Sequence, residues 1–253
     1  MQDTRIIKLP NAEVRVLPDA TTLARAAADA FLRAAREAID ATGRFTVALS
    51  GGSTPKAIFK LLADNHAAGA NMLPWDKVQL FFGDERHVPP DHPESNFRMA
   101  SETLLSKVPI PAENIHRIEG ELNAADAAAR YEARLRSAFA IPGNATPRFD
   151  LVMLGMGSDG HTASLFPGST ALQEKSKLVC ATWIEKFQSH RITFTFPLIN
   201  AAAEVLFVAG GPDKASMLRD VLRGDPHVHP AQGIRPANGL LVWLVDEAAA
   251  SAL

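Results

Sequence analysis

The sequence contains a single cysteine among 253 residues, Cys180, which excludes an intrachain disulfide and a metal site built from several thiolates. Because Cys180 lies in the apolar run 178–181, we expect a buried thiol in a reducing compartment. No uninterrupted apolar segment approaches the roughly 20 residues needed to cross a bilayer, and residues 1–4 do not lead from a basic stretch into an apolar one. We therefore expect a cytoplasmic protein.

Neither sign of charge is in excess. The 26 Lys and Arg residues nearly balance 28 Asp and Glu residues, which leaves a net charge of −2. This balance supplies no field for binding nucleic acid or an anionic membrane, so we expect neither as a partner and favour small-molecule chemistry. A chain of this length can bury roughly 70–75% of its unfolded surface. We expect one domain over residues 1–253, as a monomer or small homo-oligomer.

The hydrophobic pattern alternates between helices and strands. Apolar residues recur at helical spacing over residues 21–39, and charged side chains fill the other face. Further helices are expected at 124–140 and 213–222, and strands at 45–49, 78–82, 150–154, 204–209 and 240–245. This alternation predicts an α/β fold with a doubly wound, mostly parallel sheet. Residues 191–196 alternate strictly, which predicts a small mixed or antiparallel region, and residues 224–239 are expected to form a long surface loop.

Three loops at strand ends carry the candidate site, because ligands of open α/β sheets gather outside the carboxyl ends of the strands. The first loop combines glycines and hydroxyls with a helix start at Pro55, and its backbone N–H groups suit a phosphate. No Gly-Lys-Ser/Thr follows, so a nucleoside triphosphate cradle is not indicated. A tight turn that needs glycine is the alternative. The candidate phosphate ligands are Ser50, Gly51, Gly52, Ser53 and Thr54.

The second loop, residues 83–90, packs four ionisable side chains behind an apolar strand. Arg86 can grip a phosphate or polarise a carbonyl, and the adjacent acids Asp84 and Glu85 can hold it in place. A solvated charged loop with a local ion pair is the alternative. Downstream, residues 95–98 resemble a capped helix start, and we expect Asn96 to be the cap in preference to a ligand contact.

The third loop, residues 155–168, contains the pattern G-x-G-x-x-G. A dinucleotide site would also need a sustained helix and an acid about 20 residues further on, but Pro167 and Gly168 end any helix early. His161 directly after the third glycine instead predicts acid–base chemistry, since imidazole exchanges protons near neutrality. Asp159 or Asp84 could orient this imidazole, and a purely structural histidine is the alternative.

Metal binding is not indicated by the histidines. No His-Glu-x-x-His motif occurs, and His87, His92, His227 and His229 lie among prolines without an ordered set of carboxylates. We expect these four to be surface histidines.

Together the three loops resemble the 6-phosphogluconolactonases, relatives of the glucosamine-6-phosphate deaminases and ribose-5-phosphate isomerases. The similarity covers residues 48–55, 82–86, 95–96, 155–167 and 191–193. Deaminases continue the Asp-Gly-His loop towards Asn-Glu-Pro, whereas residues 164–167 read Ser-Leu-Phe-Pro, which favours the lactonase branch. The resemblance implies a modified Rossmann-like fold, no required cofactor, and the second step of the oxidative pentose phosphate pathway. It also implies that Arg191 and Lys214 help to bind the anionic substrate.

Lactone hydrolysis fits these residues as a hypothesis in which neutral His161 takes a proton from water and returns it to the leaving ring oxygen. Arg86 would stabilise the oxyanion or hold the substrate. An acyl-enzyme through Ser164 is a minor alternative, because no G-x-S-x-G motif occurs. The rival functions are a sugar-phosphate isomerase or deaminase and a non-catalytic sugar-phosphate sensor.

Overall fold

An eight-stranded sheet forms the centre of the computed structural model, which describes residues 4–69, 72–141, 143 and 145–253. The strand order is β1-β2-β11-β10-β7-β3-β4-β6, and every neighbouring pair is parallel except β1 with β2. The predicted α/β fold with a mostly parallel sheet is confirmed. The strands are β1 (Arg5–Leu9), β2 (Ala12–Leu17), β3 (Phe45–Leu49), β4 (Val78–Phe82), β6 (Ile115–His116), β7 (Leu151–Leu154), β10 (Glu204–Ala209) and β11 (Leu240–Asp246).

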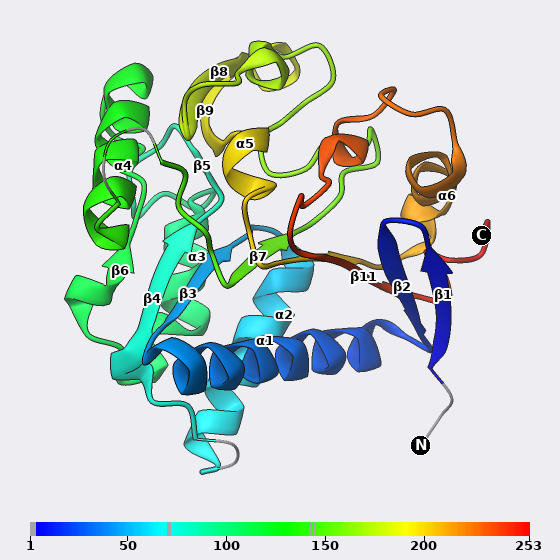
Figure 1. Ribbon diagram of the computed structural model, residues 1–253, viewed down its shortest axis with the longest axis horizontal. Coiled ribbons are helices and arrows are strands. Elements are labelled where there is room, and N and C mark those ends of the chain that lie inside the picture. The colour runs from blue at the N-terminus through cyan, green and yellow to red at the C-terminus, as the bar shows by residue number, and fades with distance from the viewer. Residues whose placement is uncertain (1–3, 70–71, 142, 144) are drawn as a thin grey trace.

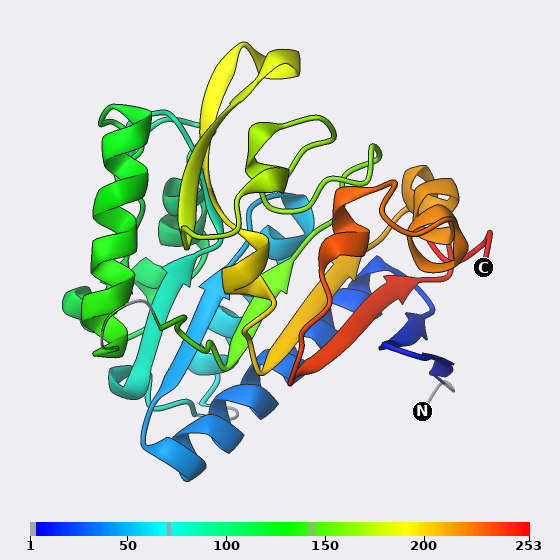
Figure 2. The ribbon, with the colours of Figure 1, turned by 45° about the horizontal axis from the view of Figure 1, so that its top comes forward.

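A second, antiparallel sheet has the order β5-β9-β8, with β5 at Asp84–Arg86, β8 at Val179–Ile184 and β9 at Ser189–Phe194. Its yellow β8–β9 hairpin stands above the main sheet in Figure 2. Gly83 joins the two sheets, because its N–H donates to the Leu49 carbonyl at 2.9 Å and its carbonyl accepts from the Phe194 N–H at 2.8 Å. The predicted antiparallel region is confirmed, and part of the predicted second loop is the short strand β5.

Helices cover the main sheet and flank the second one. Helix α1 (Ala20–Thr42) begins at Asp19, whose carboxylate accepts from the Thr22 N–H, and ends at Gly43 with a φ of 80°. It crosses one face of the sheet in Figure 1 and packs against α2. Helix α4 packs against β8 and β9. The remaining helices are α2 (Ser53–Ala67), α3 (Asn96–Thr103), α4 (Ala124–Phe139), α5 (Phe196–Ile199) and α6 (Ala215–Arg223), and short 3-10 turns occupy Trp75–Lys77, Leu105–Lys107, Ala112–Asn114, Thr170–Gln173, Glu185–Phe187, Pro212–Lys214 and Pro230–Gly233.

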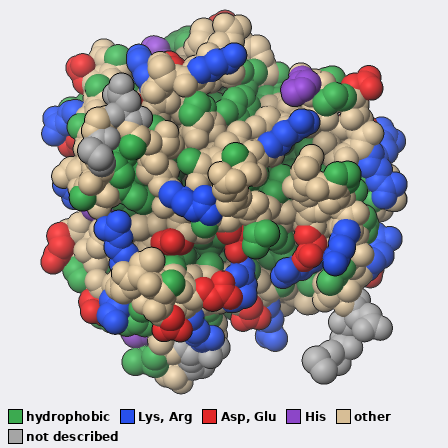
Figure 3. Space-filling view, in the orientation of Figure 1, with side chains coloured by type: hydrophobic (Ala, Val, Ile, Leu, Met, Phe, Trp, Pro, Cys, Tyr) green, Lys and Arg blue, Asp and Glu red, His purple; other side chains and the backbone are tan. Residues whose placement is uncertain are grey.

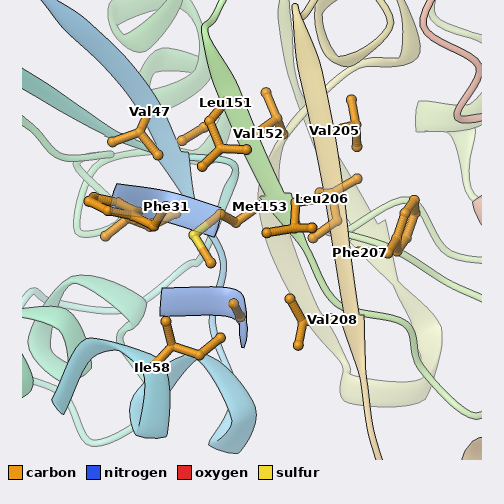
Figure 4. Close-up of a cluster of buried hydrophobic side chains, with 14 of the residues drawn as sticks. Phe31, Val47, Ile58, Leu151, Val152, Met153, Val205, Leu206, Phe207 and Val208 are labelled. Atoms are coloured by element: carbon orange, nitrogen blue, oxygen red, sulfur yellow. The ribbon is translucent and has the colours of Figure 1, made fainter. Parts of the chain in front are cut away.

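The core lies between α1, α2 and the central strands. Figure 4 shows Phe31 of α1 and Ile58 of α2 packing towards Val47, Met153 and Leu206 of the sheet. All five side chains are fully buried, and each contributes about 1.5–3 kcal/mol relative to exposure. Burial on both faces explains why the central strands appear in the sequence as continuous apolar runs.

Several predicted boundaries change. Asp150 precedes β7, and its carboxylate accepts from the N–H and the hydroxyl of Thr46, both at 2.7 Å. The predicted helix 213–222 begins with a 3-10 turn and becomes α-helical at Ala215. Residues 1–3, where no leader is expected, lie outside the described residues. In the part of the chain that the structure describes, no helix has the length and apolar character of a membrane span.

Candidate active site

The three candidate loops leave neighbouring strands. The order β7-β3-β4 places the carboxyl ends of these parallel strands side by side. After β3 the chain adds β4 and β6 on one side of β3 and then β7, β10 and β11 on the other, so the strand order reverses at β3. A cavity of about 210 Å³ lies where the loops meet. Two larger hollows, of about 570 and 660 Å³, flank α4 away from this strand edge. The small cavity is lined by Ser50, Gly51, Gly52, Asp84, Arg86, Asn96, Gly155, Met156, Gly157, His161 and Ala163.

His161 and Asp159 form a dyad at the cavity. The imidazole Nδ1 lies 2.5 Å from Oδ1 of Asp159, and the His161 N–H donates to the same oxygen at 3.2 Å. Burial disfavours the ionised form of Asp159, but the hydrogen bond and charge of His161 outweigh it, so the pKa of this carboxyl is lowered. An ionised Asp159 holds the proton on Nδ1, which leaves Nε2 as the acceptor of the ring.

The surroundings of the dyad restrict the imidazole. Its ring stacks on Phe166, with 4.0 Å between the centroids. A Cβ on Gly157 would lie 2.1 Å from Nδ1 of His161 and 2.7 Å from Oδ1 of Asp159. Only glycine therefore leaves room for the dyad. On the outer side, the ammonium of Lys186 lies 3.7 Å from Oδ2 of Asp159.

Arg86 and Arg191 lie directly opposite one another on β5 and β9. Like charges at facing positions repel, and the Arg191 residue is only 8% exposed. Burial, and then the charge of Arg86, lowers the pKa of Arg191. Among the described residues, neither guanidinium has a carboxylate oxygen within 4.0 Å, although Arg86 donates to the Glu94 carbonyl. An anion between the two arginines would relieve the repulsion.

The first loop approaches Asn96 closely. A Cβ on Gly51 would lie 1.9 Å from Oδ1 of Asn96, so this position excludes a side chain. Gly52 has a φ of 108° and precedes α2, which begins at Ser53 rather than at Pro55. Ser50 and both glycines line the cavity, whereas Ser53 and Thr54 belong to the first turn of α2 and do not line it.

The acids of the second loop bond to partners other than His161, although Asp84 lines the same cavity. Asp84 accepts from the Ser164 hydroxyl at 2.7 Å, and Glu85 accepts from the N–H groups of Asn96 and Phe97, both at 2.8 Å. Burial raises the pKa of Glu85 against the effect of these bonds. Of the two acids left open as the partner of His161, Asp159 therefore makes the contact. The prediction of Asn96 as helix cap is wrong: the hydroxyl of Ser95 caps α3, and Asn96 is its first residue.

Lys214 and the four histidines lie outside the lining of the cavity. The ammonium of Lys214 pairs with Asp213 at 2.9 Å, after β10. Of the expected surface histidines only His227 is exposed, whereas His87, His92 and His229 are half-buried. Nε2 of His87, for example, lies 2.7 Å from the Leu122 carbonyl oxygen of a neighbouring segment. No cluster of three or more His, Cys, Asp and Glu side chains suited to a metal ion occurs among the described residues.

A comparison with known protein families matches residues 18–243 to the model described as glucosamine-6-phosphate isomerases/6-phosphogluconolactonase. The chain belongs to this family. A 6-phosphogluconolactonase from Nostoc sp. is 46% identical over 243 residues, which cover 95% of this chain and 98% of that protein. A 6-phosphogluconolactonase from Homo sapiens is 42% identical over 217 residues, covering 84% and 82%.

Solved structures of the glucosamine-6-phosphate isomerase/6-phosphogluconolactonase family share this fold. A 6-phosphogluconolactonase from Trypanosoma cruzi has a TM-score of 0.84 at 28% identity and covers 98% of this chain and 99% of its own. A monomeric glucosamine-6-phosphate deaminase reaches 0.79 at 19% identity, covering 95% and 99%. The second similarity shows the fold alone. The predicted family and modified Rossmann-like fold are confirmed.

Three residues at the dyad or in the cavity lining are not among the candidates predicted from the sequence. Phe166 stacks on the imidazole, Lys186 approaches Asp159, and Met156 lines the cavity. Phe166 and Met156 lie inside the third loop and could have been chosen by proximity to His161. Lys186 lies 25 positions further along the chain than His161 and reaches Asp159 only through the fold of the β8–β9 hairpin.

Proposed function

We propose that this chain hydrolyses 6-phospho-D-glucono-1,5-lactone to 6-phospho-D-gluconate, a step of the oxidative pentose phosphate pathway. The observation that carries the proposal is the His161–Asp159 dyad beside a cavity that Arg86 and the glycine loop also line. Relatives named 6-phosphogluconolactonase that match most of the chain support the same reaction.

His161 acts as the general base. Its Nδ1 proton is held by Asp159, so Nε2 takes a proton from a water molecule as the water oxygen attacks the lactone carbonyl. The tetrahedral intermediate carries an oxyanion. When the bond between the carbonyl carbon and the ring oxygen breaks, the imidazolium returns the proton to the ring oxygen, and the carboxylic acid product then ionises in water. Catalysis of this type contributes about 10²–10⁴-fold to the rate.

The substrate is held by its charges. The N–H groups of Ser50, Gly51, Gly52, Ser53 and Thr54 precede or begin α2, and the positive end of this helix favours a phosphate. Arg86 lines the cavity together with the glycine loop and stabilises the oxyanion or the substrate, and Arg191 adds a second positive charge. Lys214 contributes in the same way, once its ammonium leaves Asp213.

We further propose that residues 1–253 act as one domain, as a monomer or small homo-oligomer, and without a nucleic acid or membrane partner. Figure 3 shows positive and negative side chains interspersed on the viewed face, in keeping with the net charge of −2. We place the protein in the cytoplasm on the strength of the free, buried thiol of Cys180. Some plant relatives bear names that specify the chloroplast.

The test is acid release from freshly generated 6-phosphogluconolactone, followed with a pH indicator against the spontaneous hydrolysis background. Rapid release by the native protein supports the lactonase. Release at the background rate would contradict it, and a ketose phosphate formed from an aldose or amino-sugar phosphate would instead indicate an isomerase or deaminase. A sensor would bind 6-phosphogluconate without either reaction.

A further inference from the structure

A buried polar contact connects the second and third loops away from the dyad. Oδ2 of Asp84 accepts from the Ser164 hydroxyl at 2.7 Å. Asp84 is 8% exposed and Ser164 is 1% exposed, so water competes little for this bond. The N–H of Ser164 donates to the Thr193 hydroxyl at 3.2 Å, which fixes the same residue to β9. Ser164 is thus held by its backbone and by its side chain.

The same carboxyl group reaches the first loop through Asn96. The Nδ2 group of Asn96 donates to the carbonyl of Asp84 at 3.0 Å and to its Oδ1 at 3.3 Å. The Oδ1 atom of Asn96 occupies the space that a side chain at Gly51 would need. Gly51, Asn96, Asp84 and Ser164 therefore form a continuous connection across all three loops.

A tight turn separates Ser164 from the general base. The N–H of Leu165 donates to the Thr162 carbonyl at 2.9 Å, and Ala163 within this turn has a φ of 47°. Non-glycine residues rarely adopt this conformation, so the surroundings must hold it. The bond from Ser164 to Asp84 holds one end of the turn, and His161 lies at the other end.

We propose that Asp84 is a positioning residue that holds His161 in register with the phosphate loop, by accepting from Ser164 on one side and from Asn96 on the other. The inference rests on the proposed lactonase function and deepens it. It assigns Asp84 no proton transfer. The two halves of the connection have different consequences: Ser164 sets where the base lies, and Asn96 sets where the glycine loop lies.

The first experiment compares Ser164→Ala with Ser169→Ala in steady-state lactonase kinetics. Ser164→Ala removes the donor to Asp84 without adding bulk, and we expect kcat to fall about tenfold with KM within about twofold of the native value. Ser169→Ala is the matched control, because it removes a buried hydroxyl that has no hydrogen-bond partner among the described residues. We expect it to leave kcat unchanged. Circular dichroism confirms that each variant is folded at the assay temperature.

The second experiment tests the opposite half and the coupling. Asn96→Ala should raise KM about fivefold with a smaller change in kcat, because it frees Gly51 rather than His161. Asp84→Asn leaves one acceptor oxygen for two donors, so Ser164→Ala added to it should cost less than about twofold further. Should Asp84→Asn fail to fold, the contrast between Ser164→Ala and Asn96→Ala decides.

Three outcomes of the first experiment would overturn the inference while native activity stands: native kcat in Ser164→Ala, equal loss in Ser169→Ala, or a loss in Ser164→Ala confined to KM. Fully multiplicative losses in the Asp84→Asn and Ser164→Ala cycle would do the same. A native protein that releases acid only at the background rate would instead overturn the proposed function, and the inference with it.

Discussion

Two histidines in different regions of this molecule stack on a phenylalanine ring, but their Nδ1 atoms have different hydrogen-bond partners. His161 stacks on Phe166 and shares its Nδ1 proton with Asp159. His116, on the edge strand β6, stacks on Phe81 with 4.2 Å between the centroids, and its Nδ1 accepts from Nε of Arg134 at 2.9 Å. Burial, and then the charge of Arg134, lowers the pKa of His116 to about 4.

The neighbour of Nδ1 therefore decides the chemistry of each ring. A carboxylate keeps the proton on Nδ1 and leaves Nε2 free to accept another. A guanidinium donates to Nδ1, so the proton of His116 is on Nε2, where it bonds to the side-chain oxygen of Gln79 at 2.8 Å. His116 is 5% exposed and has no free acceptor, whereas the side chain of His161 is 27% exposed beside the cavity. Stacking on an aromatic ring is common to both and does not distinguish a base from a structural histidine.

The same substitution in the two regions sharpens this comparison most. We expect His161→Gln to lower kcat about 10²–10⁴-fold with little change in KM, because it removes the proposed general base. His116→Gln should leave the kcat of the folded protein within about threefold of native, since His116 does not belong to the lining of the cavity. Acid release from 6-phosphogluconolactone measures both. Equal losses in the two variants would end the distinction, and a native kcat in His161→Gln would remove the base from the mechanism.

Much of the fold could be predicted from local pattern. Residues 45–49, 78–82 and 204–209 form strands at the predicted positions, because their apolar runs are buried on both faces of the sheet. The hairpin of β1 and β2 was not predicted. No residue of β1 is fully buried, and the buried residues of β2 depend on its pairing with the distant β11. Strand order depends on such pairings, which no local window contains.

The site was predictable as a set of loops but not as a set of contacts. Asp159 lies two positions from His161, and the turn at Gly160, with a φ of 77°, brings the two side chains together. Asp84 is equally acidic in the sequence, yet its partners are Ser164 and Asn96. Arg86 and Arg191 face one another only because of the register of β5 and β9. The sequence around each arginine therefore could not predict that the two charges lie together.

Gly157→Ala should break the dyad while leaving both of its members in the chain. The added Cβ would lie 2.1 Å from Nδ1 of His161, so the imidazole or the loop must move. A misplacement of a catalytic group by about 1 Å can cost about 10²-fold in rate, and we expect a loss of this order in kcat. If Gly157 acts through the dyad, Gly157→Ala should lower kcat much less in the Asp159→Ala variant than in the native protein. Undiminished loss in the double variant would assign the glycine another role.

Acid should destabilise the protein through His116. In the unfolded chain the imidazole of His116 binds a proton near pH 6.5, whereas in the folded protein its pKa is lowered to about 4. The stability that neutral His116 contributes is fully present above pH 6.5. The free energy of unfolding falls as the pH drops towards 4, by at most about 3 kcal/mol. Urea unfolding across this window measures the fall. Because carboxylates titrate in the same range, the comparison is with His116→Gln, in which the slope should be shallower; an identical slope would contradict the assignment.

The two stacked phenylalanines provide the smallest and most selective contrast. An aromatic pair contributes about 0.5–1.5 kcal/mol beyond its buried area, so Phe166→Leu should lower kcat by about 2- to 10-fold as the imidazole gains freedom about its ring plane. Phe81→Leu makes the same change beneath His116, in the core, and should lower the melting temperature by several degrees without changing kcat. A fall in kcat from Phe81→Leu alone would mean that the region of His116 is coupled to the site. Loss confined to Phe166→Leu would show that stacking matters to catalysis only where a carboxylate has already made the imidazole a base.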